Sequence, residues 1–294
     1  MNPTETISKK IMRRFYKYLG PEKKYVESIT TYNLGYSVNI DNPRTFNEKL
    51  AWIKLYDHNP VYHTMVDKYA VKQLVSEKIG AQYVAKPLMI FESYKEISKS
   101  ALPKPPFVIK SVHYGSPIVV RSESDLNMDF IIEKLKRQSQ TSGYDLLREW
   151  GYKDVKPRVM IEEYLSDGSE NDILQDYKFW CFNGTVKCMY VTIKDRNVYE
   201  NFYDTDFNIL DIDHGFPRHQ PEFSKPETFE EMKRLAGVLS AGIPFVRVDF
   251  YSCSGKVYFG EYTFYDWGGM HPFRTYEMDL EIGSWLTLPN KKRM

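Results

Sequence analysis

The dipeptide Asn183-Gly184 is the feature that most constrains how this chain can fold. It separates two strand-like runs, and Asn-Gly at such a point is the strongest short-range signal for a two-residue β-hairpin. A second hairpin is expected near the C-terminus, where two runs are joined through Ser254-Gly255. The four runs are residues 176–182, 185–194, 245–251 and 256–263. Because hairpins make neighbouring strands antiparallel, these runs should build a mostly antiparallel sheet.

Helical patterns dominate the first part of the chain. Thr45 precedes apolar residues at helical spacing, and Glu48 follows it as in a capping box, which predicts the start of a helix. A second helix is expected over residues 66–79, ending at Gly80. Further helices are expected over residues 126–148 and from Pro226 onward, and further strands at residues 107–112, 118–121 and 158–165.

The order of these elements predicts an α+β fold. Strands and helices do not alternate regularly, which disfavours a doubly wound parallel sheet. We expect three parts: a helical N-terminal region of residues 1–64, a small α+β unit of residues 65–162, and a mostly antiparallel unit of residues 163–294. A chain of 294 residues has enough apolar material for a core in each of the two larger parts.

Composition narrows the classes of function. The formal net charge is +1, which gives no reason to propose a nucleic-acid partner. The three cysteines form no CxxC pair and fit a reducing cytoplasm better than a disulfide framework. No run approaches the roughly 18 apolar residues of a membrane span, so we expect a soluble, cytoplasmic protein.

The N-terminal segment carries a strong local charge bias. Apolar residues stand between seven basic ones, which are Lys9, Lys10, Arg13, Arg14, Lys17, Lys23 and Lys24. This segment could lie on an anionic membrane surface, with peripheral association to a membrane assembly. Alternatively, it is a docked helix whose basic face is solvated.

The C-terminal hairpin carries the candidate metal site. Side chains alternate along a strand, so Arg247 and Asp249 share a face. A two-residue loop would put Glu261 on the opposite face, whereas a three-residue loop with Gly255 in the left-handed region would place Glu261 and Thr263 beside them. We expect the three-residue loop. The two carboxylates then suit Mg²⁺, and the arginine suits a phosphate or carboxylate, although a surface Arg–Asp pair remains the alternative.

Two further patterns suggest a bound nucleotide. Lys110 lies on an expected strand that leads into a loop with Gly115 and Ser116, where backbone N–H groups and an ammonium can converge on phosphates. Asp176 and Lys178 share a strand face and could meet ribose hydroxyls and a phosphate. Taken alone, each pattern is more typical of solvated surface side chains.

Two DxD triplets allow a different chemistry. Asp204-Thr205-Asp206 and Asp211-Ile212-Asp213 fit the metal-binding pattern of glycosyltransferases. The first triplet also fits an ordinary hairpin turn. No histidine pair has zinc-site spacing, and no GxSxG element predicts a serine nucleophile.

Read in order, these segments resemble the ATP-grasp superfamily, specifically its TupA-like branch, which is linked with bacterial surface-polysaccharide synthesis. The resemblance covers most of the chain. It rests on NPRTFNEKL, MVDKYAVK, FVIKSVHYGS, VMIEEYL, DYKFWCFNG, FVRVDFY and YFGEYTF. It implies two α+β subdomains that clasp ATP, with the helical region before them.

The resemblance also implies roles for individual residues. Contacts to ATP are expected from Lys68, Lys110, His113, Gly115, Ser116, Glu162, Glu163, Leu165, Asp176 and Lys178. Asp249 and Glu261, with Thr263 as a third contact, would hold Mg²⁺, and Arg247 and Arg196 would steady the transferred phosphoryl group.

Three departures from the family pattern limit this transfer. Thr263 stands where many relatives have asparagine. Tyr114 and Pro117 should stiffen the phosphate loop. Residues 1–64 are too few and too helical for the first domain of many relatives, so the acceptor site does not transfer.

The reaction implied is ATP-dependent ligation of a carboxylate to an amine through an acyl phosphate. The branch suggests a uronic acid, or a growing surface polymer, as the carboxylate and an amino acid or small amine as the nucleophile. The alternatives are a glycosyltransferase that uses a DxD triplet, an ATP-grasp phosphotransferase that acts on a hydroxyl, and a nucleotide-binding scaffold without catalysis.

Overall fold

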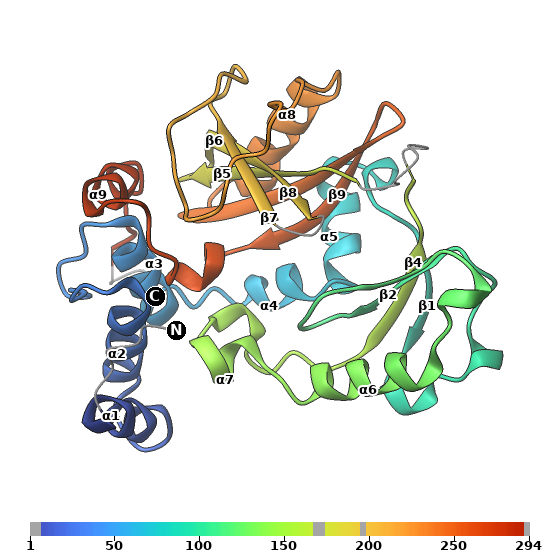
Figure 1. Ribbon diagram of the computed structural model, residues 1–294, viewed down its shortest axis with the longest axis horizontal. Coiled ribbons are helices and arrows are strands. Elements are labelled where there is room, and N and C mark those ends of the chain that lie inside the picture. Colours follow the sequence, from blue (N-terminus) through green and yellow to red (C-terminus); the bar gives the residue numbers. More distant parts are fainter. Residues whose placement is uncertain (1–6, 167–173, 195–197, 291–294) are drawn as a thin grey trace.

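The computed structural model describes residues 7–166, 174–194 and 198–290. Two antiparallel sheets lie in separate lobes, a smaller lobe built on the four-stranded sheet and a larger lobe built on the five-stranded sheet, and a group of helices lies beside them (Figure 1). The expected α+β class and antiparallel pairing are confirmed, since every named strand pair runs antiparallel. Within the described ranges, no helix is both long and apolar enough to cross a membrane.

Five helices precede the first strand. They are α1 (Ile7–Tyr18), α2 (Glu22–Leu34), α3 (Phe46–Tyr56), α4 (Val61–Val66) and α5 (Ala70–Ile79). The capping box at the start of α3 is confirmed, because the Thr45 side chain accepts from the Glu48 N–H while the Glu48 side chain accepts from the Thr45 N–H. Helix α3 is buried along most of its length against α9 (Tyr276–Ser284). Gly283 allows this packing, since a Cβ there would collide with backbone at Arg44 and Phe46.

The helix expected over residues 66–79 begins later than predicted. Asp67 interrupts it, because its Oδ1 accepts from the N–H groups of Tyr69 and Ala70 and so competes with helical hydrogen bonds. The break leaves the Lys68 N–H to donate to the Val112 carbonyl at 2.9 Å. The expected end at Gly80 is confirmed.

The smaller sheet has four strands in the order β1-β4-β2-β3. These strands are β1 (Pro87–Phe91), β2 (Phe107–Ser111), β3 (Ile118–Val120) and β4 (Val159–Glu163). Helix α6 (Met128–Ser139) packs its apolar face on this sheet through Ile131 and Leu135. The single helix expected over residues 126–148 is wrong: a break after α6 precedes the short α7 (Gly143–Leu147). The sequence Thr141-Ser142-Gly143 explains the break, since all three are weak helix formers.

The larger sheet has five strands in the order β7-β6-β5-β8-β9. They are β5 (Asp176–Phe182), β6 (Thr185–Lys194), β7 (Val198–Tyr203), β8 (Phe245–Cys253) and β9 (Lys256–Thr263). The Asn183-Gly184 hairpin is confirmed, with both residues in the left-handed region. Helix α8 (Phe229–Ser240) covers one face, and its Phe229, Met232, Ala236 and Leu239 are buried as their spacing predicted.

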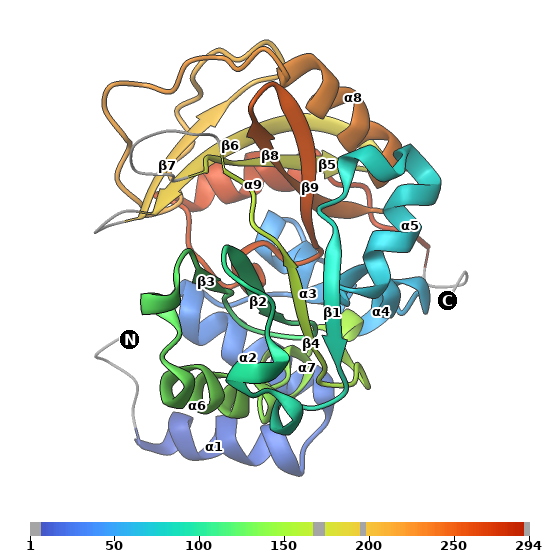
Figure 2. The same cartoon turned by 90° about the vertical axis from the view of Figure 1, so that its right-hand side faces the viewer.

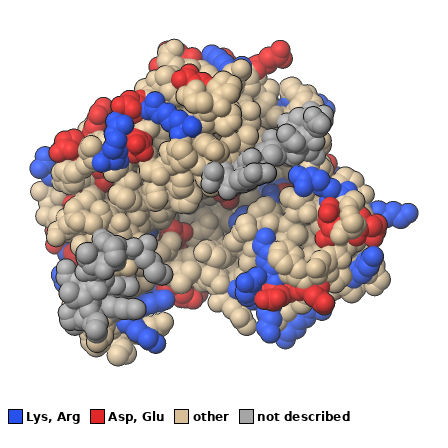
Figure 3. Space-filling model, viewed as in Figure 1, with Lys and Arg blue, Asp and Glu red and all other residues tan. Residues whose placement is uncertain are grey.

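The opposite face of the larger sheet is divided. At one end, Phe46 from α3 packs against Trp180, Phe182 and Phe245. At the other end, the same face bears charged residues of β5 and β8. The space-filling view is hollowed between the two sheet-bearing lobes on this side (Figure 3). The candidate site lies where the charged end of the sheet meets the smaller lobe.

Candidate nucleotide and metal site

The C-terminal hairpin brings Asp249 and Glu261 together, although not by the predicted route. The loop has two residues, Ser254-Gly255, since Cys253 pairs directly with Lys256, so the three-residue loop is wrong. A β-bulge restores the alignment: Asp249 pairs with Glu261 and Phe250 pairs with Phe259. The two-residue loop alone would put the Asp249 and Glu261 side chains on opposite faces, and the extra residue brings them to the same face.

The extra residue is Gly260, which no residue of β8 opposes. A Cβ at this position would lie 3.2 Å from the Asp249 carbonyl oxygen and from the Tyr251 ring. Glycine therefore permits the close approach that places the two carboxylates opposite each other.

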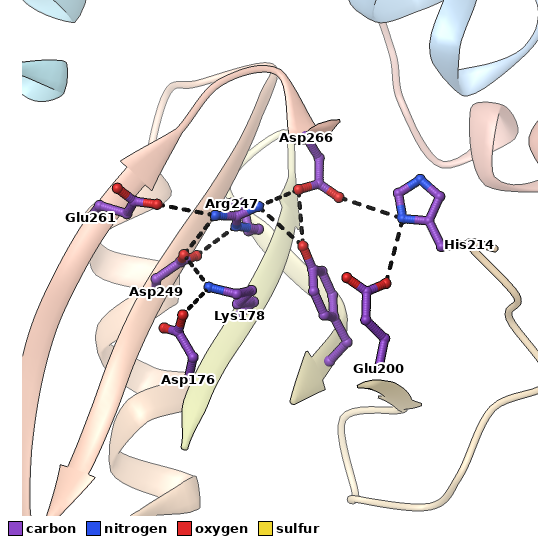
Figure 4. Close-up of polar contacts among 9 residues, drawn as sticks. Asp176, Lys178, Glu200, His214, Arg247, Asp249, Glu261 and Asp266 are labelled. Atoms are coloured by element: carbon purple, nitrogen blue, oxygen red, sulfur yellow. Dashed lines mark hydrogen bonds and ion pairs between the residues drawn. The ribbon is translucent and has the colours of Figure 1, made fainter. Parts of the chain in front are cut away.

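Arg247 is the centre of a buried polar network (Figure 4). Its Nε and Nη2 donate to the two oxygens of Asp249, each at 2.7 Å, which is a bidentate pair. Its Nη1 donates to Asp266 and, at 3.1 Å, to the Tyr190 hydroxyl, while Nη2 also lies 3.3 Å from Glu261. Because every nitrogen already donates to protein, contact with a phosphoryl group would require exchange of at least one of these bonds.

Lys178 links this network to Asp176. Its Nζ lies 2.5 Å from Asp176 Oδ2 and 2.8 Å from Asp249 Oδ2. Burial raises the pKa of the Asp249 carboxyl, but Arg247 and Lys178 outweigh that effect and hold the pKa below its usual range. Burial raises the pKa of Asp176, whose Oδ1 has no hydrogen-bond partner among the described residues. Asp176 thus keeps an acceptor available for a ligand hydroxyl.

Asp249 and Glu261 are the hairpin residues that would hold Mg²⁺, since they stand opposite each other on β8 and β9. Both accept from the same Arg247 nitrogen, so a cation would have to replace at least one of these contacts. Asp249 is buried, whereas the Glu261 side chain is 42 % exposed. Mg²⁺ takes one or two carboxylates and completes its octahedron with water and phosphate oxygens.

As a third ligand to a metal ion, Thr263 would be weaker than the two carboxylates. It lies opposite Arg247 on the hairpin, on the face of Glu261, and supplies only a hydroxyl. Among the residues that the structure describes, no group of three or more His, Cys, Asp or Glu is arranged to hold a metal. Any cation here would therefore depend on ligand oxygens as well as on Asp249 and Glu261.

Lys68, in the segment between α4 and α5, lies near Glu261. Burial lowers the pKa of the Lys68 ammonium, and the strongest opposing attraction comes from Glu261 across the hollow. Within the described part of the chain, the Lys68 ammonium makes no hydrogen bond or ion pair. Lys68 is half-buried, and a partly desolvated cation without a partner is stabilised when an anion binds beside it.

Lys110 and a second lysine share one carboxylate. Glu162 is buried and pairs with Lys110 and, at 2.9 Å, with Lys72. Burial raises the pKa of Glu162, but the two lysines outweigh it and lower the pKa overall. Lys72 was not predicted as a site residue. In the sequence, however, Lys72 follows Lys68 by four residues in MVDKYAVK, which is the spacing of one helical face.

A pocket of about 180 Å³ opens between the lobes beside these lysines. Lys110, Glu162, Glu163 and Leu165 line it from the smaller lobe and the segment after β4, and Tyr251 lines it from β8. Glu163 shapes this edge, since its Oε1 accepts from the Lys86 N–H at 2.7 Å. Both apolar and charged side chains line the pocket, as suits a nucleotide base.

The expected phosphate loop is anchored rather than free. His113 is buried, with Nδ1 3.0 Å from the Ser111 hydroxyl and Nε2 3.0 Å from the Gln138 carbonyl. Gln138 Nε2 also donates to the Ser116 carbonyl at 2.9 Å. Gly115 has φ +94°, and a side chain there would meet Gln138, so glycine is required. Ser116 remains exposed, whereas His113 serves to attach the loop to α6.

The remaining candidates lie away from this site or outside the described residues. Arg196 falls outside the described residues. Asp204 is used by its own turn, since its Oδ1 accepts from the N–H groups of Asp206 and Asn208. Asp211 is exposed and pairs with Arg218 and Arg274. Neither DxD triplet therefore presents a free pair of carboxylates.

A second buried cluster was not predicted from the sequence. His214 Nδ1 lies 3.8 Å from Glu200 and 3.9 Å from Asp266, the residue that also accepts from Arg247 (Figure 4). Burial raises the pKa of Glu200 to about 8 and lowers that of His214 to about 4. These residues come from three separate segments, so no local spacing could have identified them.

The antiparallel lobes, the pocket between them and the facing lysines and carboxylates define an ATP-grasp protein. The sequence model of the TupA-like ATP-grasp family matches residues 48–287, and this chain belongs to that family. None of the curated proteins matches the sequence.

Several solved structures share a looser similarity. One is the ATP-grasp ligase PsnB complexed with minimal precursor, Mg and ADP, at 15 % identity and TM-score 0.39, covering 79 % of this chain and 60 % of that one. Another is D-alanine-D-alanine ligase from Helicobacter pylori, at 16 % identity and TM-score 0.43, covering 77 % and 60 %. A third is L-amino acid ligase from Bacillus licheniformis, at 12 % identity and TM-score 0.38, covering 86 % and 53 %. The chain thus spans less than two thirds of each, and the family match alone carries the assignment.

Proposed function

We propose that this protein is an ATP-dependent ligase that joins a carboxylate to an amine. The observation that carries the proposal is the meeting of lysines and carboxylates beside the interlobe pocket. Lys110 lines the pocket and, like Lys72, pairs with Glu162. The strongest attraction on Lys68 comes from Glu261, which stands opposite Asp249 on the hairpin. Membership of the TupA-like ATP-grasp family supports the same conclusion.

The proposed placement of ATP follows the charges. The base would enter the pocket beside Glu163 and Leu165, with the ribose near the unpaired oxygen of Asp176. The phosphates would lie between Lys68 and Lys110 and the loop at Ser116. Mg²⁺ held by Asp249 and Glu261 would neutralise charge on the phosphate oxygens.

Two group transfers would then occur. A carboxylate oxygen of the acceptor attacks the γ-phosphorus, the bond to the β,γ-bridging oxygen breaks, and ADP leaves. The amine then attacks the acyl carbon, the bond to the phosphate oxygen breaks, and phosphate and a proton are released. Lys68 and Lys110 would neutralise charge in the first step, while the network of Arg247 keeps Asp249 ionised and in place.

The acceptor class is the finer part of the proposal. We propose a uronic acid, or a related carboxylate of a surface polysaccharide, with an amino acid or small amine as nucleophile. This assignment rests on the family branch and not on a contact in the site.

The test measures products in the presence of Mg²⁺, ATP, a uronic acid and a panel of amino acids. A ligase releases ADP and phosphate only when both co-substrates are present, whereas a phosphotransferase forms ADP without free phosphate. Asp249→Asn should abolish turnover; because it also removes the charge partner of Arg247 and Lys178, its folding is checked by thermal unfolding without ATP. Unchanged turnover would refute the metal assignment. A rise in melting temperature with UDP-sugars but not with ATP would favour the glycosyltransferase instead.

A further inference from the structure

Helix α1 exposes an apolar face that nothing in the described chain covers. Ile11, Phe15 and Tyr18 stand at helical spacing on one side and are 62, 49 and 68 % exposed, and Leu19, just past the helix end, is 78 % exposed. These four are among the most exposed large apolar residues of the described chain. A contiguous apolar patch of this kind marks an interaction surface rather than ordinary solvent contact.

The charge of the helix indicates which partner this face fits. Helix α1 contains five Lys or Arg residues and no Asp or Glu, although the whole chain has a net charge of only +1. Two copies of such a helix would repel each other if their apolar faces met. A basic helix with an apolar face is instead complementary to a layer of anionic lipid headgroups over acyl chains.

The position of α1 leaves this face accessible. The helix lies at the margin of the molecule, beyond α2 and away from the five-stranded sheet, in both ribbon views (Figures 1 and 2). It packs on α2, and Arg148 anchors its last turn, since Nη2 donates to the Lys17 carbonyl at 2.8 Å. These contacts hold α1 against α2 and Arg148, and they leave the side chains of Ile11, Phe15 and Tyr18 exposed to solvent.

We propose that α1 binds the surface of an anionic membrane, with Ile11, Phe15, Tyr18 and Leu19 inserted at the headgroup level. Of the two alternatives that the sequence left open, a helix docked by its apolar side does not agree with these exposures. The inference does not depend on the proposed reaction.

The test is sedimentation of the full chain with vesicles. We expect binding to an equimolar mixture of phosphatidylglycerol and phosphatidylcholine, and little binding to phosphatidylcholine alone. The double variant Ile11→Ser/Phe15→Ser should weaken binding by about tenfold or more. The control Phe130→Ser/Val238→Ser removes similarly exposed apolar residues from α6 and α8 and should bind as the original chain does.

Three results would overturn the inference. One is the absence of binding to the anionic vesicles, and another is equal binding to both vesicle types. The third is self-association without lipid that Ile11→Ser/Phe15→Ser abolishes, since it would assign the face to a second copy. Thermal unfolding and the ATP-induced rise in melting temperature, measured on the same variants, separate loss of this surface from loss of folding or of the nucleotide site.

Discussion

Replacing Lys178 by methionine tests whether the polar end of the larger sheet is held by charge pairing. The ammonium is buried between Asp176 and Asp249, at 2.5 and 2.8 Å. Methionine preserves the apolar stem and removes the charge. Asp249 would keep its bidentate pair with Arg247, but Asp176 would lose the only side-chain partner that the structure gives it within the described residues.

The expected loss of stability comes from the carboxylate of Asp176, which is left without a positive partner. Removal of one partner of a buried ion pair costs about 3–5 kcal/mol, since it leaves an uncompensated buried charge. We expect about 3 kcal/mol for Lys178→Met, because Arg247 still compensates Asp249. At roughly 2–4 °C per kcal/mol for a chain of this size, the melting temperature should fall by about 6–12 °C.

The assay is urea and thermal unfolding at neutral pH, without nucleotide. Lys178→Met/Asp176→Asn should recover part of the loss, because the unpaired carboxylate is gone, with a coupling of about 1–3 kcal/mol. Lys187→Met, on the exposed side of β6, is the matched control and should change stability by less than about 0.5 kcal/mol. The reasoning is refuted if Lys178→Met is no worse than Lys187→Met, or if the double variant recovers nothing.

Two other predictions concern single charges. Burial raises the pKa of Glu200 to about 8 in the folded protein, above its ordinary value near 4.5. The folded state therefore favours the protonated carboxyl. The stability that this protonation gives is complete below pH 4.5 and is lost as pH rises through 8. The stability of Glu200→Gln should therefore vary less than that of the original chain between pH 5 and 9 in urea titrations; parallel curves would contradict this. Lys68→Met removes a half-buried ammonium that has no ion pair in the described structure, so the melting temperature without ligand should stay the same or rise, while the increase caused by Mg-ATP shrinks. The exposed Lys86→Met should leave both quantities unchanged, and a normal ATP response in Lys68→Met would remove Lys68 from the site.

Local chemistry was enough to predict four of the five strands of the larger sheet, β5, β6, β8 and β9, but not β7. Asn183-Gly184 favours the left-handed backbone of a tight hairpin whatever surrounds it, and the Thr45–Glu48 capping box satisfies N–H groups within one turn. The spacing of α8 follows in the same way from the helical period. These signals act between residues close in sequence, so they are readable without tertiary contacts. Most of the candidate residues came from the ordered family resemblance, because their individual patterns were ambiguous.

Only the tertiary structure decided how the charged residues meet. The facing of Asp249 and Glu261 depends on the bulge at Gly260, where close packing between strands outweighs the loop parity read from the sequence. The cluster of Glu200, His214 and Asp266 joins segments that no local rule connects, because its contacts arise from packing of distant parts of the chain. The sequence alone thus determined which residues were available for a nucleotide site. Packing determined which of them are paired, which are buried and which are left to bind a ligand.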